Sequence, residues 1–288
     1  NSWWHFVGQD NGIKPGLGFT MKGIGTAETG SQTYDFRGKP NNGDLFNTVL
    51  GGQFTLVGNP YPSALDARAF IHDVHNKTTI NGTLYFWEQK STGSHYMADY
   101  EGGYATYTIS EDGIVESFTK ALFSKYNGSG EVVDPGSASE TSKRVKRFIP
   151  IGQGFMVEGV VNGTVKTSNA QRTYYKESDP ESEFFRTGNS TQSPTTNSQN
   201  DNGLILPEAY SRFRVYVTFN DLYIRELLLN FHDNATTDFD YGLESASASS
   251  VENDASWSVS YGDYVTQALP YSNDLVIPLK LKAQEDLA

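Results

Sequence analysis

The stretch that decides the fold class is Arg212-Phe213-Arg214-Val215-Tyr216-Val217-Thr218-Phe219. Its odd positions are apolar and its even positions are polar or amphipathic, and this period of two predicts a strand with one buried face and one wet face. The next segment, Tyr223–Phe231, is apolar on both faces, as a central strand would be. Leu275, Ile277, Leu279 and Leu281 repeat the period of two. With no long 3.6-residue apolar period elsewhere, the sequence predicts an all-β fold that is sandwich-like or jelly-roll-like.

Composition and charge narrow the class further. The 288 residues include 28 Gly and 13 % aromatic residues, which suits a strand-and-turn protein of one large or two smaller domains. The net charge of −12 repels phosphate backbones and anionic lipid surfaces, so we expect no nucleic-acid partner. We expect the one cationic run, residues 143–147, to be an exposed loop or strand end. The chain has no cysteine and no apolar run of ~18 residues, which excludes disulfides, thiolate sites and helical membrane insertion.

Local signals predict two particular elements. Gly154–Val161, the pair Asn162-Gly163 and Thr164–Thr167 together have the pattern of strand, two-residue turn and strand. A short helix is expected near residues 63–71, with Ser63 as its N-cap and Asp66 in its first turn. The rest of the chain is expected to be strands and turns.

The stretch from Asp179 to Gly203 changes to Ser, Thr, Asn, Gln, Gly and Pro with little apolar content. Such a composition does not offset its own ordering entropy. We therefore predict a β-sandwich domain over residues 1–180, a flexible linker or long loop over 181–203, and a second, smaller β domain over 204–288. One extended sandwich with an inserted polar loop remains the alternative.

A series of motifs follows in a fixed order along the chain. They are Gly16-Leu17-Gly18-Phe19-Thr20-Met21-Lys22-Gly23, Phe36-Arg37-Gly38-Lys39-Pro40-Asn41-Asn42-Gly43, Leu56–Asp66, Gly82–Glu88, Ala98–Tyr107, Ile151–Phe155, Arg225–Leu229 and Thr237–Gly242. In this combination the chain resembles the region that precedes the type IX sorting domain in large exported proteins of Flavobacteria and related Bacteroidetes. The resemblance implies a place outside the cell or on its outer surface, among adhesins and polysaccharide-acting enzymes, and carries over no catalytic residue.

Aromatic residues crowd one part of the chain and form the candidate ligand site. Sugar rings pack their C–H faces on aromatic planes, so these side chains are candidates for carbohydrate binding. They are equally what the core and cross-strand pairs of a sandwich would need, and Leu84–Trp87 is apolar on both faces. Glu88 and Glu101 lie beside them, and a glycosidase pair is left open, although we assign no catalytic residue. The candidates are Tyr85, Trp87, Tyr96, Tyr100 and Tyr104, with Tyr107 at the end of the stretch.

A second candidate site is the acidic loop that contains Asp233, Asp238 and Asp240. Closely spaced oxygen donors suit Ca²⁺, which takes six to eight oxygen ligands in irregular geometry, and Glu244 could add another. A structural Ca²⁺ is therefore a possible cofactor of this loop. The alternative is an ordinary solvated loop in an acidic chain, because the spacing does not match an EF-hand.

These observations lead to two functional hypotheses. The first is a non-catalytic, secreted or cell-surface module for adhesion or structural display, carried as type IX secretion cargo. The second is a carbohydrate-binding module of a secreted polysaccharide-degrading enzyme. The expected partners are extracellular polysaccharide or cell-surface components. An enzyme in its own right has no support from motifs, since neither a nucleophile elbow nor a metalloprotease motif nor a P-loop occurs.

Overall fold

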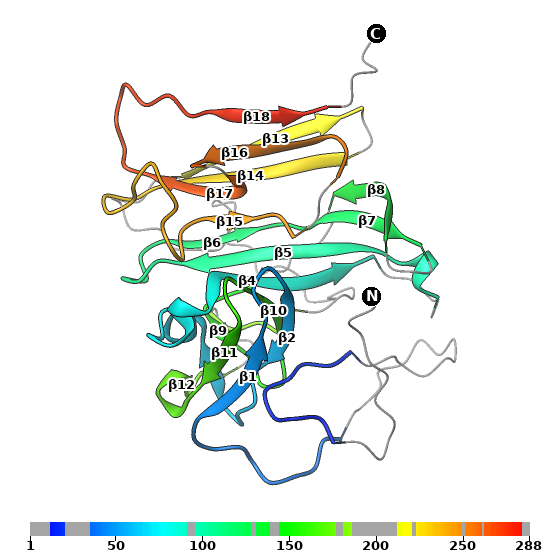
Figure 1. Ribbon diagram of the computed structural model, residues 1–288, viewed down its shortest axis with the longest axis vertical. Coiled ribbons are helices and arrows are strands. Elements are labelled where there is room, and N and C mark those ends of the chain that lie inside the picture. The colour runs from blue at the N-terminus through cyan, green and yellow to red at the C-terminus, as the bar shows by residue number, and fades with distance from the viewer. Residues whose placement is uncertain are drawn as a thin grey trace.

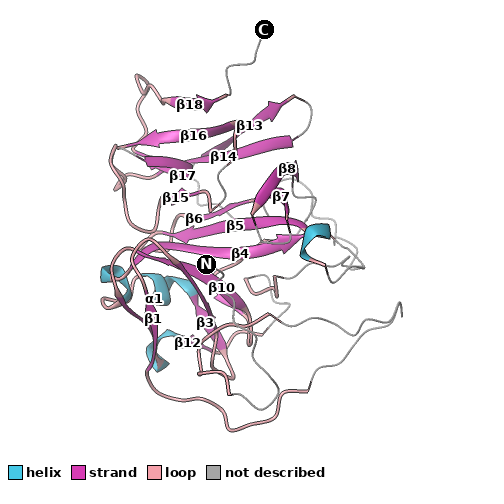
Figure 2. Ribbon diagram, turned by 45° about the vertical axis from the view of Figure 1, so that its right-hand side comes forward, coloured by secondary structure: helices cyan, strands magenta, loops and turns pink. Residues whose placement is uncertain are grey.

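The fold is all-β and sandwich-like, as the sequence predicts. The computed structural model describes residues 12–20, 35–90, 96–127, 131–138, 144–176, 181–185, 212–220, 223–248, 251–260 and 262–283. Within these residues, strands are packed in two lobes, one above the other in Figure 1, and one short α-helix lies at the side of the lower lobe (Figure 2). No helix in the described part of the chain is long and apolar enough to cross a membrane.

The first lobe is built around one large sheet. Its strands run in the order β2-β10-β4-β5-β7-β8, and β6 pairs with β5. Small sheets, β1-β11 and β12-β3-β9, extend it downward in Figure 1. The strands are β1 (Leu45–Val49), β2 (Phe54–Gly58), β3 (Ala64–Asp66), β4 (Ile80–Gln89), β5 (Glu101–Ile109), β6 (Glu116–Thr119), β7 (Leu122–Tyr126), β8 (Val132–Ala138), β9 (Phe148–Ile149), β10 (Gly154–Gly159), β11 (Gly163–Thr167) and β12 (Arg172–Thr173).

The hairpin predicted at Asn162-Gly163 is wrong, although both of its strands form. β10 pairs with β2 and β4, whereas β11 pairs with β1. The two pairings β1–β11 and β2–β10 share one antiparallel register and are the arms of a single ladder that turns a corner between them. A Cβ on Gly159 would lie 2.4 Å from the Leu50 carbonyl oxygen, so the two chains approach too closely at the corner for any larger residue. The Asn-Gly pair therefore belongs to a bend between sheets and not to a chain reversal.

The predicted helix exists, but it begins later than expected. Helix α1 spans Ala67–Ile71, and Asp66 is its N-cap, with the carboxylate accepting from the Arg68 N–H. Ser63 is not the cap, because Ala64–Asp66 is strand β3, paired with β9 and β12. The Asp66 carboxylate also binds Arg147 through two hydrogen bonds of 2.9 and 2.7 Å. Arg147 ends the cationic run 143–147 directly before β9, so this part of the run is a strand end, as expected.

Below the large sheet lies an apolar core. Phe86 and Tyr107 point into it from β4 and β5, and Phe155 from β10 packs edge-to-face on Phe70 of α1 with ring centroids 5.4 Å apart. Each of these four side chains is at most 1 % exposed. This core buries the side chains on the lower face of the large sheet.

The second lobe is one strongly curled sheet with the strand order β13-β14-β17-β16-β18, and β15 pairs with β17. β14 is buried along nearly its whole length between β13 and a parallel β17, which confirms the prediction of a central strand. Inside the curl lie Leu227, Leu229, Trp257, Val265 and Leu269. The strands are β13 (Arg212–Phe219), β14 (Tyr223–Phe231), β15 (Ser245–Ala246), β16 (Asp254–Val259), β17 (Gly262–Leu269) and β18 (Leu279–Lys282).

The lobes meet through small apolar clusters, such as Val115 with Ala235, Leu243 and Ala268, and through a buried polar band, which we call the hydroxyl seam. It consists of Thr83, Thr106, Thr108, Ser117 and Thr119 from the first lobe, and Asn230, Ser245 and Thr266 from the second. Each of these residues is at most 3 % exposed. The hydroxyls of Thr119 and Thr266 lie 2.7 Å apart, the Asn230 amide donates to Ser117 over 2.9 Å, and Ser245 donates to Thr106 over 3.0 Å.

The predicted linker begins inside the first lobe. Phe185 is 5 % exposed, belongs to the apolar core, and its N–H donates to the Gln153 side chain. Residues 186–203 lie outside the described part of the chain. The division of the chain at the polar stretch thus stays a prediction.

Candidate functional site

A β-bulge creates an irregularity where the two lobes meet. Thr106 of β5 pairs with Thr119, whereas Gly102 of β5 pairs with Ser124. Four steps along β5 therefore match five steps along the chain from β6 to β7, and the extra residue forms a bulge at Lys120-Ala121. Such bulges redirect side chains and recur beside functional sites.

Two adjacent glycines of β5 let the chains on both of its sides approach closely. A Cβ on Gly103 would lie 2.2 Å from the Leu122 carbonyl oxygen, and a Cβ on Gly102 would lie 2.5 Å from the Glu88 carbonyl oxygen. Any side chain at either position would force the strands apart. Gly103 is thus the local reason that the chain opposite β5 can bulge toward it, whereas Gly102 lets β4 approach β5 from the other side.

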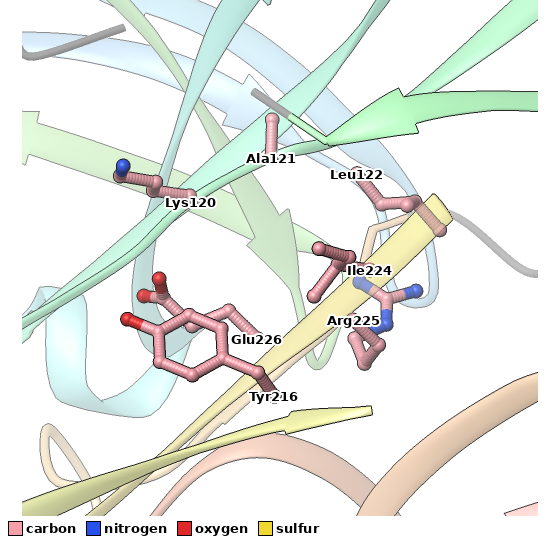
Figure 3. A pocket seen from close by; sticks show the side chains of 7 residues that line it. All are labelled: Lys120, Ala121, Leu122, Tyr216, Ile224, Arg225 and Glu226. Atoms are coloured by element: carbon pink, nitrogen blue, oxygen red, sulfur yellow. The ribbon is translucent and has the colours of Figure 1, made fainter. Parts of the chain in front are cut away.

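Above the bulge is a cavity of about 100 Å³ between the lobes. In Figure 3, the Lys120 ammonium, the Glu226 carboxylate and the Tyr216 hydroxyl lie toward one side, and Leu122, Ile224 and the Arg225 guanidinium lie toward the other. Tyr216 and Ile224 are 56 % and 40 % exposed, so they form an open rim. The lining residues are Lys120, Ala121 and Leu122 of the bulged chain, Tyr216 of β13, and Ile224, Arg225 and Glu226 of β14.

Ion pairs neutralise most of the charge around this cavity. Arg225 binds Asp254 bidentately, with nitrogen–oxygen distances of 2.6 and 2.9 Å, and Glu226 pairs with Arg214, whose side chain is 7 % exposed. Arg214 was expected on the wet face of its strand; the first lobe covers it instead, and it also donates to the Phe118 carbonyl. Lys120 has no hydrogen bond or ion pair with any described residue. The residues that line the cavity therefore include one unpaired positive charge, although the chain as a whole has a net charge of −12.

The aromatic residues proposed for carbohydrate binding separate into buried and accessible ones. Tyr85 is 1 % exposed, and burial raises its pKa, so it is a packing residue. Trp87 and Tyr104 are directly opposite in the β4–β5 ladder, with ring centroids 5.0 Å apart, and Tyr126 of β7 lies 5.8 Å from Trp87. We call these three half-buried side chains the aromatic cluster. Burial raises the pKa of Tyr126 to about 12.

The remaining aromatic candidates lie beyond β4 at the start of β5. Tyr96 is 77 % exposed and Tyr100 is half-buried. Neither residue lines the cavity. Glu101 forms an ion pair of 2.6 Å with Lys90, and Glu88 is 4 % exposed on the core face of β4. Neither acid lines the cavity, so the glycosidase pair left open by the sequence gains no support.

Two carboxylates of the acidic loop accept hydrogen bonds from protein groups. Asp240 accepts from the N–H and the hydroxyl of Thr236 at 2.6 and 3.2 Å, and Asp238 accepts from Ser260 at 3.0 Å. Among the described residues, no three acidic or histidine side chains converge as a metal site, and Asp233 joins no such group. The calcium site stays a prediction; a lower melting temperature in EDTA, restored by Ca²⁺, is the measurement that tests it.

Two buried glutamates have raised pKa values, and both serve the fold. Burial raises the pKa of Glu244 to about 8; its two oxygens accept from the N–H groups of Asp240 and Ala268. Burial likewise raises the pKa of Glu116 to about 7, and the Tyr107 hydroxyl donates to it over 2.9 Å. Shifted acids often mark active sites. These two face backbone and core, away from the cavity.

Comparison with known families gives one match, to the family described as a domain of unknown function (DUF8693), over residues 1–286. The chain belongs to this family. No curated protein and no solved structure matches it. Because membership in DUF8693 names no activity, the function must be argued from the geometry.

The site of this DUF8693 chain contains residues that the sequence alone did not single out. Lys120, Glu226 and the bulge come together from segments about a hundred residues apart. One signal was present: two glycines inside a strand, Gly102-Gly103, mark a bulge or a close approach of backbones. Nothing in the sequence said which residue the bulge would redirect.

Proposed function

We propose that this chain is a non-catalytic module of an exported surface protein that acts in adhesion or structural display. The observation that carries the proposal is the hydroxyl seam. Because its buried hydroxyls pair across the interface, sliding one lobe on the other would leave polar groups unsatisfied, at about 1–3 kcal/mol each. A body of fixed shape suits a part that holds other segments or presents loops at a surface.

The positions of the acids support the non-catalytic character. The acids with raised pKa, Glu116 and Glu244, face the core and backbone amides, and Glu226 in the cavity pairs with Arg214. General acid–base chemistry needs such groups within reach of a substrate. The resemblance to regions before type IX sorting domains supports the surface location.

The proposal is tested by asking whether the chain attaches to a surface without degrading it. Beads coated with the chain are passed under flow over films of extracellular polysaccharide and of cell-surface protein, with beads carrying an unrelated acidic β-sandwich domain as the control. We expect retention above the control and no new reducing ends in the film. Retention equal to the control, or release of soluble sugar, would contradict the proposal.

The aromatic cluster favours a second candidate function, carbohydrate binding. Trp87, Tyr104 and Tyr126 combine ring faces with partial exposure, as a platform for sugar rings requires. We expect binding on a glycan array that Trp87→Ala abolishes. Tyr174→Ala, which removes a side chain 96 % exposed elsewhere on the first lobe, should leave it unchanged. Equal binding by both variants would remove this candidate.

A further inference from the structure

We propose that the cavity at the Lys120-Ala121 bulge binds the carboxylate of a sugar acid, a hexose ring that carries one carboxylate group. This inference rests on the second candidate function, carbohydrate binding, and specifies its ligand and its site. It is argued from the charge, the size and the rim of the cavity.

The charge of the cavity calls for one anion. Within each of the pairs Arg225–Asp254 and Arg214–Glu226, the two opposite charges cancel. The Lys120 ammonium, which also lines the cavity, has no partner among the described residues. Lys120 is partly buried at the edge of the cavity. Its ammonium is therefore less screened than one on the open surface, so an anion there gains more from it. The charge that remains matches a single carboxylate.

The size of the cavity excludes a whole ligand. A volume of about 100 Å³ holds roughly three water molecules, far less than the 300–1,000 Å³ of a typical small-molecule site. It accommodates one functional group of a few atoms. The remainder of the ligand must lie outside, on the rim.

The rim offers what a sugar ring needs. Tyr216 presents a ring with 56 % exposure, and Ile224 adds an apolar surface that is 40 % exposed. A pyranose with its carboxylate directed at Lys120 would place a C–H face on this wall. The cavity and the aromatic cluster lie near the same end of the pairing between β5 and β7: Gly102 pairs with Ser124, and Tyr104 and Leu122 each lie two residues from this pair. A longer saccharide could therefore continue from the rim toward the aromatic cluster.

The bulge explains why the lysine is at this place. In regular pairing, the side chains after Thr119 would continue to point alternately to the two faces of the sheet. The extra residue at Lys120-Ala121 shifts this alternation by one residue relative to β5. Because Gly103 makes the bulge possible, the positions of Lys120 and Leu122 have one structural cause.

Titration calorimetry on the full chain tests this inference, with glucuronate as the probe. Glucose, acetate, glucose 6-sulfate and a short glutamate peptide are the comparison ligands. We expect one glucuronate per chain and affinity at least 10-fold above that of each comparison ligand, about 1.4 kcal/mol. Lys120→Met should weaken glucuronate binding 10-fold or more. Lys176→Met, which removes the same charge from an exposed position, should leave it unchanged.

Each other outcome overturns the inference in a defined way. Equal binding by acetate or by the sulfate ester means that the site does not recognise a sugar acid, and tighter binding by the peptide means a protein partner. An unchanged affinity in Lys120→Met, with a melting temperature equal to that of the parent chain, places glucuronate elsewhere and leaves the carbohydrate function standing. No sugar binding, together with retention of coated beads on protein films, ends the inference but not the adhesion proposal.

Discussion

The two faces of the β4–β5 pair are both buried, yet they are built from opposite chemistry. The lower face carries Phe86 and Tyr107 into an apolar core, whereas the upper face carries Thr83, Thr106 and Thr108 into the hydroxyl seam. Apolar burial is non-directional and proportional to area, while hydroxyl pairs require one register. The difference suggests that the core supplies most of the stability of the first lobe and that the seam fixes how the second lobe sits on it.

The largest effect is expected from the apolar face. Phe155→Ala removes a ring that packs on Phe70 and Phe86 with 1 % exposure, and should lower the free energy of unfolding by about 3–5 kcal/mol. Urea denaturation measures it. Tyr174→Ala serves as the surface control and should change it by less than about 0.5 kcal/mol. A loss below about 1 kcal/mol in Phe155→Ala would break the comparison.

The second-largest loss of stability is expected from breaking the ion pair between Arg214 and Glu226, next to the hydroxyl seam. Arg214→Met leaves the Glu226 carboxylate buried without its partner and should cost about 3 kcal/mol, because an uncompensated buried charge is strongly unfavourable. The double variant Arg214→Met with Glu226→Leu should recover most of that loss. If the double variant is as unstable as the single one, then packing by Arg214, and not its charge, is what matters.

The change in the free energy of unfolding with pH should be smaller than the effect of Arg214→Met, and Glu244 determines its sign. The pKa of this acid is about 8 in the fold against an ordinary 4.5, so the folded chain holds a proton that the unfolded chain has released between these values. The contribution of Glu244 to the free energy of unfolding is therefore complete below about pH 4.5 and decreases until the pH has risen through 8, by about 2–3 kcal/mol between about pH 6 and pH 9. Glu116 adds a term of the same sign.

Calorimetric melting of the parent chain and of Glu244→Gln at about pH 6 and pH 9 separates the two acids. We expect the Gln variant to lose less on going to the higher pH, with the remaining loss due to Glu116. Glu116→Gln is the matched variant in the first-lobe core. Identical pH dependence in the parent chain and Glu244→Gln would show that this acid is not protonated in the fold.

The smallest loss of stability is expected from a change in the hydroxyl seam, and it tests directly whether the hydroxyl groups pair across the two lobes. Thr119→Val leaves the Thr266 hydroxyl without its partner at 2.7 Å and should cost about 1–2 kcal/mol. Thr119→Val with Thr266→Val replaces both hydroxyls by methyl groups of similar shape and should cost less than the sum of the two single changes. A double-mutant cycle measures the coupling. Strict additivity would mean that the two hydroxyls do not interact across the seam.

Much of the fold was accessible from sequence because strand alternation is local. Period two and double-sided apolar runs identified β13 and β14, and the apolar faces of Leu84–Trp87 correctly indicated burial of Tyr85. Two local predictions were wrong for non-local reasons. Asn162-Gly163 had the chemistry of a hairpin turn but lies at a sheet corner set by Leu50, and Ser63 lost the helix cap to Asp66 because β3 pairs with β9 and β12.

The sequence by itself determined the class of structure: the strands, the central position of β14, the absence of thiol chemistry and the acidic balance. These follow from side-chain period and composition, which act over a few residues. Only the tertiary structure decided that threonine-rich faces are buried against each other, that Arg214 faces Glu226 under a lobe, and that Lys120 turns into a cavity. The hydroxyl seam, the cover of the first lobe over Arg214 and the cavity each depend on contacts between segments about a hundred or more residues apart. Residue spacing along the chain contains no record of which distant strand will lie opposite.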